Sequence, residues 1–142
     1  MAFRERLAWI SLAAVGGGFL AYLYLVLTIG TRAGWAAPVW AIVGPLVLMG
    51  LIVAIVAAIG AAIAAIHAPR DANAPEDERD RSIGRSASAG AYMVALVGLA
   101  MAVNALLFGW TLFQLAALLV GLIALAEGSR YALEIRAYRK AA

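Results

Sequence analysis

The sequence predicts an all-α membrane protein in which four transmembrane helices form an antiparallel bundle, with helices three and four extended into the cytoplasm. Hydrophobic residues make up 65% of the 142 residues, whereas soluble domains are about 45–50% apolar. The mean hydropathy is +0.94. Apolar runs close to or above the roughly 20 residues that cross a bilayer lie on both sides of a polar stretch at 75–86.

The first two spans are expected at residues 7–29 and 39–66. The first run is longer than the about 7–15 apolar residues of a signal peptide, so we interpret it as a retained span. We expect it to end at Gly30, because glycine accepts the left-handed backbone of a helix C-terminus. Pro38 suits the first turn of the second helix. Pro45 predicts a kink in that helix, because proline lacks a backbone N–H.

A polar cytoplasmic loop, 67–86, precedes the third span, which is expected at 87–108. We expect a helix to restart at Pro75 and to run on into this span, because acids in the next turn meet the positive end of the helix dipole. The fourth span is expected at 112–130. It should continue as a cytoplasmic helix over 131–140, because Ala, Leu, Glu and Arg dominate there.

A tight turn and a capping box are expected between the last two helices. Gly109 and Trp110 predict the turn. Thr111 and Gln114 have the spacing in which the threonine hydroxyl accepts from the glutamine N–H while the glutamine side chain reaches back.

The basic residues predict the orientation. Ten of the eleven Lys and Arg residues lie on the side of the termini and the 67–86 loop, and only Arg32 lies on the other. All eight acids lie on the basic side too, so the Lys/Arg distribution decides the orientation. We expect both termini in the cytoplasm and the protein in the cytoplasmic (inner) membrane. Charges placed at the ends of apolar segments argue against nucleic acid as a partner. Aromatic residues are expected at the outer interface (Trp35, Trp40 and Trp110) and near the inner one (Trp9, Tyr92 and Tyr131).

No catalytic or metal-binding pattern is present in the sequence. The absence of cysteine excludes disulfides, thiol catalysis and iron–sulfur clusters. His67 is the only histidine, and no nucleophile–base pair can be named. We therefore expect a protein that is not an enzyme and has no cofactor or metal.

Three polar residues are candidates for an intramembrane site. Glu127 is one, because an acid inside a span is by default a candidate for proton relay or cation binding. Its alternative role is an ion pair with Arg130 or a contact with Tyr92 or Arg85 on the next helix. Asn104 is expected to bond across helices or to line a polar path, to which Tyr92 would also contribute.

Small residues at helical spacing predict the packing faces of the helices, because little hydrophobic attraction acts between helices in lipid. The neighbouring helix can belong to the same chain or to a second copy. The expected positions are Gly16–Gly18 in the first span, Gly50, Ala54, Ala58, Ala61 and Ala65 in the second, Gly98 and Ala102 in the third, and Ala117 and Gly121 in the fourth.

The cytoplasmic charges are segregated, with acids before the third span and bases after the fourth. We expect these antiparallel extensions to pair acid with base. The charge run is a docking surface for a cytosolic partner, a solvated helix face with internal ion pairs, or both. The candidate surface comprises Asp77, Glu78, Arg79, Asp80, Arg81, Arg85, Arg130 and Arg136.

The stretch Asp77–Asp80, followed by Ile83 and then by Tyr92 and Gly98 in the next span, resembles a group of small bacterial and archaeal membrane proteins of unknown function. That group has an Asp-Glu-Arg-Asp stretch before a pair of spans. It usually ends in Tyr-Arg-Arg-Gly, whereas this chain has Tyr-Arg-Lys-Ala at Tyr138–Ala141. The resemblance covers the second half of the chain and implies a four-span protein without an assigned activity. Such proteins are often encoded beside small transcriptional regulators, which hints at regulation.

These observations predict a non-enzymatic interaction or regulatory protein with a charged cytoplasmic helical surface. Its expected partners are membrane lipid, a cytosolic protein and further copies of itself. The alternative is an oligomeric small transporter or channel subunit that uses Glu127 and Asn104.

Overall fold

A computed structural model describes residues 3–69 and 77–140. The long helices are α1 (Phe3–Ala33), α2 (Val43–His67), α4 (Glu78–Leu107) and α5 (Leu112–Lys140). A short 3-10 helix, η1 (Val39–Ile42), precedes α2. No strand occurs within this part of the chain. The predicted all-α fold of four long apolar helices is therefore confirmed.

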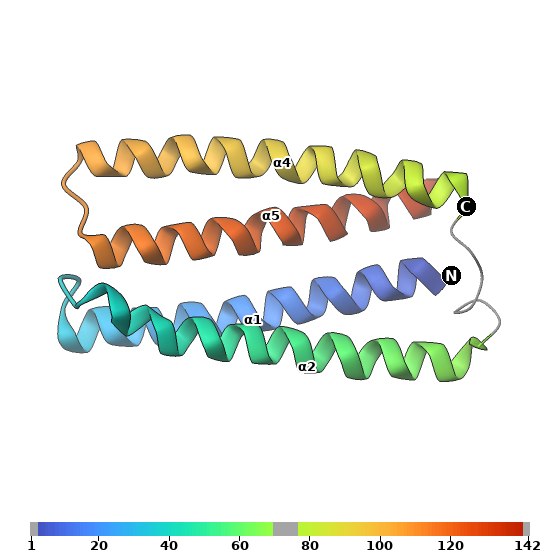
Figure 1. The fold of residues 1–142 in the computed structure, drawn as a ribbon, viewed down its shortest axis with the longest axis horizontal. Helices are drawn as coiled ribbons and strands as arrows, with labels where there is room; N and C mark the ends of the chain where they lie inside the picture. Colours follow the sequence, from blue (N-terminus) through green and yellow to red (C-terminus); the bar gives the residue numbers. More distant parts are fainter. Residues whose placement is uncertain (1–2, 70–76, 141–142) are drawn as a thin grey trace.

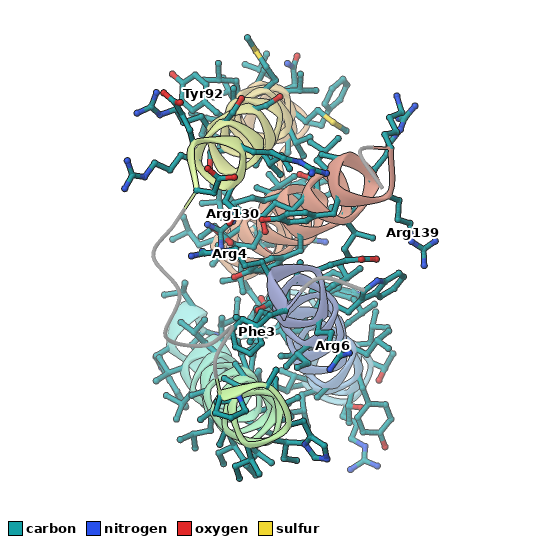
Figure 2. The ribbon with its side chains drawn as sticks, turned by 90° about the vertical axis from the view of Figure 1, so that its right-hand side faces the viewer. Phe3, Arg4, Arg6, Tyr92, Arg130 and Arg139 are labelled. Carbon is teal, nitrogen blue, oxygen red and sulfur yellow. The ribbon has the colours of Figure 1, made fainter. Side chains whose placement is uncertain are left out.

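The four helices form an open antiparallel bundle in the order α2–α1–α5–α4 (Figure 1). Extensive contacts join α1 to α2, α1 to α5 and α4 to α5. The outer helices α2 and α4 lie at opposite edges, and the view along the helices shows the same order (Figure 2). The α1–α5 contact therefore holds the two helical hairpins together.

The two ends of the molecule differ in chemistry. One end, here called the polar end, carries the start of α1, the start of α4 and the end of α5 (Figure 1). The other end, here called the tryptophan end, carries the α1–η1 and α4–α5 connections with Trp35, Trp40 and Trp110. All four helices are long and apolar enough to cross a membrane.

The first helix ends at Ala33, so the expectation that it stops at Gly30 is wrong. Gly30 is helical and buried, and a Cβ there would lie 2.8 Å from the ring of Trp35. The left-handed backbone falls instead on Gly34, whose φ is +84°. Gly30 is needed for close packing, and Gly34 for the turn.

We expected one helix over 39–66 with a kink at Pro45, but the structure has two helices of different type in this region. The 3-10 helix η1 ends at Ile42, and α2 begins at Val43. Pro38 is the N-terminal flanking residue of η1, and Pro45 lies in the first turn of α2. The missing N–H of Pro45 costs little there, because the first N–H groups of a helix have no intrahelical acceptor.

Helix α4 begins at Glu78, and Pro75, where we expected the helix to restart, lies outside the described residues. Asp77 has an extended backbone, and its carboxylate accepts a hydrogen bond of 2.7 Å from the Glu78 N–H. From there the helix is continuous through Gly84 and Gly90 into the apolar segment, as the sequence indicated. Helix α5 likewise continues to Lys140.

The predicted turn and capping box between α4 and α5 are confirmed. Gly109 has a φ of +72°. The Gln114 N–H donates to the Thr111 hydroxyl at 3.2 Å, and the Thr111 N–H donates to Gln114 Oε1 at 2.9 Å. The Thr111 hydroxyl also donates to the carbonyl of Trp35 at 2.6 Å, which ties the two connections of the tryptophan end together.

The largest buried side chains lie in the tryptophan-end half of the α1–α5 interface. Phe113 is completely buried, and Tyr22 is 2% exposed. The Tyr22 hydroxyl donates to the carbonyl of Ala117 at 3.2 Å, so this buried polar group has a partner. Val26, Ala37 and Ile42 complete this core cluster.

Small residues mark the packing faces of α1 and α4, as expected. A Cβ on Gly18 would lie 2.7 Å from Val53 of α2, and one on Gly98 would lie 2.5 Å from Leu122 of α5. On α2 most of the expected small residues face none of the other helices of this chain, so packing of this stripe against a second copy stays a prediction. The close approach of α2 is at Gly60, which faces Ile10, and at buried Ala64. The exposed members of the stripe are Gly50, Ala54, Ala58 and Ala61.

Candidate functional site at the polar end

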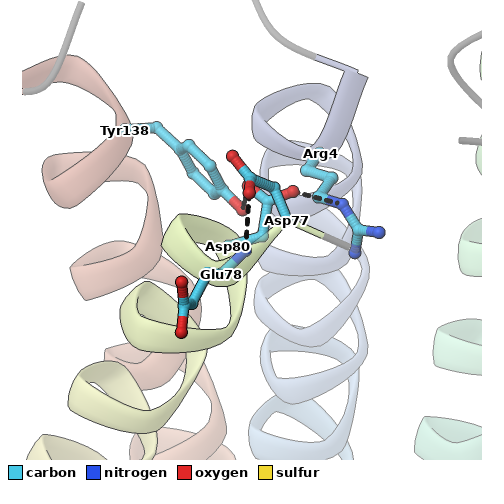
Figure 3. Close-up of polar contacts among 5 residues, drawn as sticks. All are labelled: Arg4, Asp77, Glu78, Asp80 and Tyr138. Atoms are coloured by element: carbon cyan, nitrogen blue, oxygen red, sulfur yellow. Dashed lines mark hydrogen bonds and ion pairs between the residues drawn. The ribbon is translucent and has the colours of Figure 1, made fainter. Parts of the chain in front are cut away.

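A three-helix contact centred on Asp80 fixes the start of α4. The guanidinium of Arg4, from α1, lies 2.9 Å from Asp80 Oδ2. The hydroxyl of Tyr138, from α5, donates to Asp80 Oδ1 at 3.0 Å (Figure 3). Each carboxylate oxygen thus contacts a different helix, which orients the first turns of α4 on the rest of the molecule.

Tyr138 stays a neutral hydrogen-bond donor over the physiological range. Burial, and then its bond to the Asp80 carboxylate, raise the pKa of Tyr138 to about 12. Both causes disfavour a second negative charge beside Asp80.

A second ion pair joins α1 to α5 at the same end. Glu5 is the one charged residue among the buried residues of the described chain, at 9% exposure. The Arg139 guanidinium lies 3.6 Å from its carboxylate and 5.3 Å from the centre of the Trp9 ring. Figure 2 looks onto this end and shows Arg139 on the flank of the helix row.

The expectation that the polar extensions of α4 and α5 pair acid with base is wrong in its partners. Among the described residues, the bases that follow the fourth span form no ion pair with Glu78 or Asp80 of α4. Asp80 pairs with Arg4, and Arg139 pairs with Glu5. Both contacts use the first turn of α1, because α1 packs against α5 along its length. Asp71 and Glu76, which belong to the same expectation, lie outside the described residues.

The intramembrane candidates do not form one site. Glu127 pairs with Arg130 at 3.1 Å, which is the alternative role that the sequence offered. Asn104 donates to the Ala100 carbonyl of its own helix at 2.9 Å and is exposed, so its expected bond across helices is not made within the described part of this chain. Tyr92 is 61% exposed at the α4 edge of the row (Figure 2).

The Arg130 side chain contacts two residues of its own helix, Glu127 and Tyr131. Besides Glu127, its guanidinium donates to the Tyr131 hydroxyl at 2.6 Å and lies 4.5 Å from that ring centre. Burial raises the pKa of the neighbouring Glu134, the charge of Arg130 opposes this rise, and the charge of Glu127 adds to it.

The remaining members of the charged surface lie on the first turns of α4 or near the end of α5. Asp77 caps α4, while Asp80 and Arg130 are held by the contacts described above. Within residues 3–69 and 77–140, no three His, Asp or Glu side chains come together as metal ligands. The other members have exposed side chains: Glu78, Arg79, Arg81 and Arg85 on α4, and Arg136 on α5.

Sequence reasoning missed Arg4, Glu5 and Tyr138. Their position near the chain ends did place them on the basic side of the molecule. Nothing in the local pattern indicated that α1, and not only α5, would contact the start of α4.

No family model, curated protein or solved structure matches this chain. The resemblance of Asp77–Asp80 to a group of small membrane proteins therefore stays a prediction.

Proposed function

We propose that this chain is an integral protein of the cytoplasmic membrane, with both termini and the 67–86 segment in the cytoplasm. The polar end would then face the cytoplasm. The concentration of Lys and Arg at the polar end supports this orientation, because Arg32 alone lies at the tryptophan end. In this setting the protein is a non-enzymatic interaction or regulatory protein.

The observation that carries this proposal is the fixed, charged start of α4. Arg4 and Tyr138 hold Asp80 from two other helices, so the first turns of α4 have a defined orientation. Glu78, Arg79, Arg81 and Arg85 are exposed on these turns, outside the apolar segment. A rigid helix surface with both charge signs favours a protein partner, because it loses little conformational entropy on binding.

A photo-crosslinking amino acid at Arg85 tests this proposal in cells. We expect a crosslink to one defined cytosolic protein, because Arg85 lies on the proposed docking surface. The same probe at Val103, exposed on the apolar part of α4, should give no such adduct. If the Arg81→Glu substitution abolished this adduct, binding of the partner would depend on the charge of the α4 surface. Equal adduct patterns from both positions would refute the proposal.

The competing transport function has its own test. We expect liposomes with the purified protein to show no proton or cation flux above protein-free liposomes, because Glu127 is paired with Arg130 and Asn104 bonds to its own helix. A flux that disappears in Glu127→Gln, but persists in Glu78→Gln, would contradict the interaction role and favour a transporter.

A further inference from the structure

A groove between α1 and α5 at the polar end combines positive charge with an apolar floor. It has a volume of about 360 Å³. Trp9 and Leu12 line it from α1, and Ala132 and Ile135 line it from α5. Its outer rim is formed by Arg136, Arg139 and Lys140.

The three bases share one face of α5. Their spacing of three and four residues places them on adjacent turns. Arg139 is held beside Glu5 and Trp9. Arg136 and Lys140 are exposed and form no ion pair or side-chain hydrogen bond within the described residues. Because Glu5 offsets only one of the three positive charges, the groove keeps an excess that an anion would neutralise.

The position of the groove selects the kind of anion. It lies where the apolar part of α5 gives way to the charged end of the helix, with an interfacial tryptophan beside it. A ligand that fits must bring a negative group to the rim and hydrocarbon to the floor. Basic pockets between transmembrane helices on the cytoplasmic side bind anionic lipid headgroups for this reason.

We propose that this groove binds an anionic phospholipid of the cytoplasmic leaflet. Arg136 and Lys140 contact the phosphate, and an acyl chain lies along Leu12, Ala132 and Ile135. The ring of Trp9 sits at the boundary between headgroup and chain. This inference rests on the proposed membrane orientation but not on the proposed protein partner.

Native mass spectrometry of the full chain in detergent tests the proposal. We expect retained phosphatidylglycerol and little retained phosphatidylcholine when each lipid is added at equal concentration. Added inorganic phosphate should not displace the phosphatidylglycerol, because it cannot occupy the apolar floor. Arg136→Gln/Lys140→Gln should weaken phosphatidylglycerol binding about tenfold or more, since each base near an anionic lipid surface contributes on the order of a fivefold gain.

Matched variants control for net charge and folding. Arg6→Gln/Arg32→Gln removes the same number of positive charges from residues that do not line the groove, and this variant should retain the lipid. Arg136→Lys/Lys140→Arg keeps the charge and should retain it as well. Equal lipid retention by the Arg136→Gln/Lys140→Gln and Arg6→Gln/Arg32→Gln variants would overturn the inference, as would equal binding of the two lipids by the wild type. Displacement by inorganic phosphate would also overturn it, since the site would then bind a free anion.

The test separates this inference from the proposed function. Selective lipid binding without a crosslinked cytosolic protein would support the groove and refute the partner. A crosslinked cytosolic partner without a preference for phosphatidylglycerol would support the proposed function and refute the lipid site.

Discussion

Single glycines decide how closely α1 and α2 approach. Gly16, Gly17 and Gly18 are consecutive and look alike in sequence, but only Gly18 faces α2 at close range. A Cβ on Gly18 would lie 2.7 Å from Val53 and 3.1 Å from the Met49 carbonyl oxygen. The stiff χ1 of valine and the fixed backbone oxygen leave little room for adjustment. Gly16 and Gly17 have no atom within 4 Å of such a Cβ.

We therefore predict that Gly18→Ala lowers the free energy of unfolding in detergent by about 1–3 kcal/mol, the usual cost of overpacking. Gly17→Ala is the matched control, with the same substitution on the same helix. It should be neutral or stabilise by up to about 1 kcal/mol, because alanine lowers the entropy of the unfolded chain. Thermal unfolding followed by circular dichroism measures both. Equal effects of the two substitutions would show that α1 and α2 do not pack at Gly18.

At the scale of elements, the start of α5 has two tasks. Thr111 and Gln114 satisfy N–H groups that the first turn of a helix leaves without intrahelical acceptors. The Thr111 hydroxyl also bonds to the Trp35 carbonyl, so the cap of one hairpin is anchored to the connection of the other. The local pattern predicted the cap. The contact with Trp35 depends on a residue 76 positions away in sequence.

Thr111→Val should destabilise the protein by about 1–3 kcal/mol, since a lost N-cap costs about 1 kcal/mol and a further hydrogen bond about the same. Hydrogen exchange should become faster at the first amides of α5. Thr31→Val is the control, because the Thr31 hydroxyl bonds only to carbonyls of its own helix, at Leu27 and Thr28. If Thr31→Val cost as much as Thr111→Val, the contact between the connections would contribute nothing.

At the scale of the whole molecule, the helices form an open row and do not close into a ring. An exposed apolar edge costs little in hydrocarbon, because lipid tails cover it as well as another helix would. The outer helices can therefore stay apart, and α2 can keep an exposed stripe of small residues. The membrane setting that we propose explains why such an open arrangement is stable.

Cysteine cross-linking tests the helix order, and the chain has no cysteine of its own. The Leu12→Cys/Gly128→Cys pair joins α1 to α5, where a Cβ on Gly128 would lie 4.0 Å from Leu12. With a protease site placed within residues 70–76, a short bismaleimide should keep the two cleaved halves of this variant together. The Ala58→Cys/Val94→Cys variant places one cysteine on each of the outer helices, α2 and α4. The reagent should not bridge them, so the two halves should separate. Halves of a single chain held together in the second variant would contradict the open row.

The sequence by itself determined that the chain holds four long apolar helices and roughly where they lie, the continuity of α4 and α5 with their polar extensions, the Thr111–Gln114 cap and the Glu127–Arg130 pair. These features depend on residues a few positions apart, so composition and spacing specify them. Only the tertiary structure decided that α1 lies between α2 and α5, that Asp80 meets Arg4 and Tyr138, and that α2 turns its small-residue stripe outward. In a uniformly apolar helix most faces are equally suited to lipid and to protein, so side-chain packing at close contacts such as Gly18 and Gly60, and not hydrophobicity, selects the face that is buried.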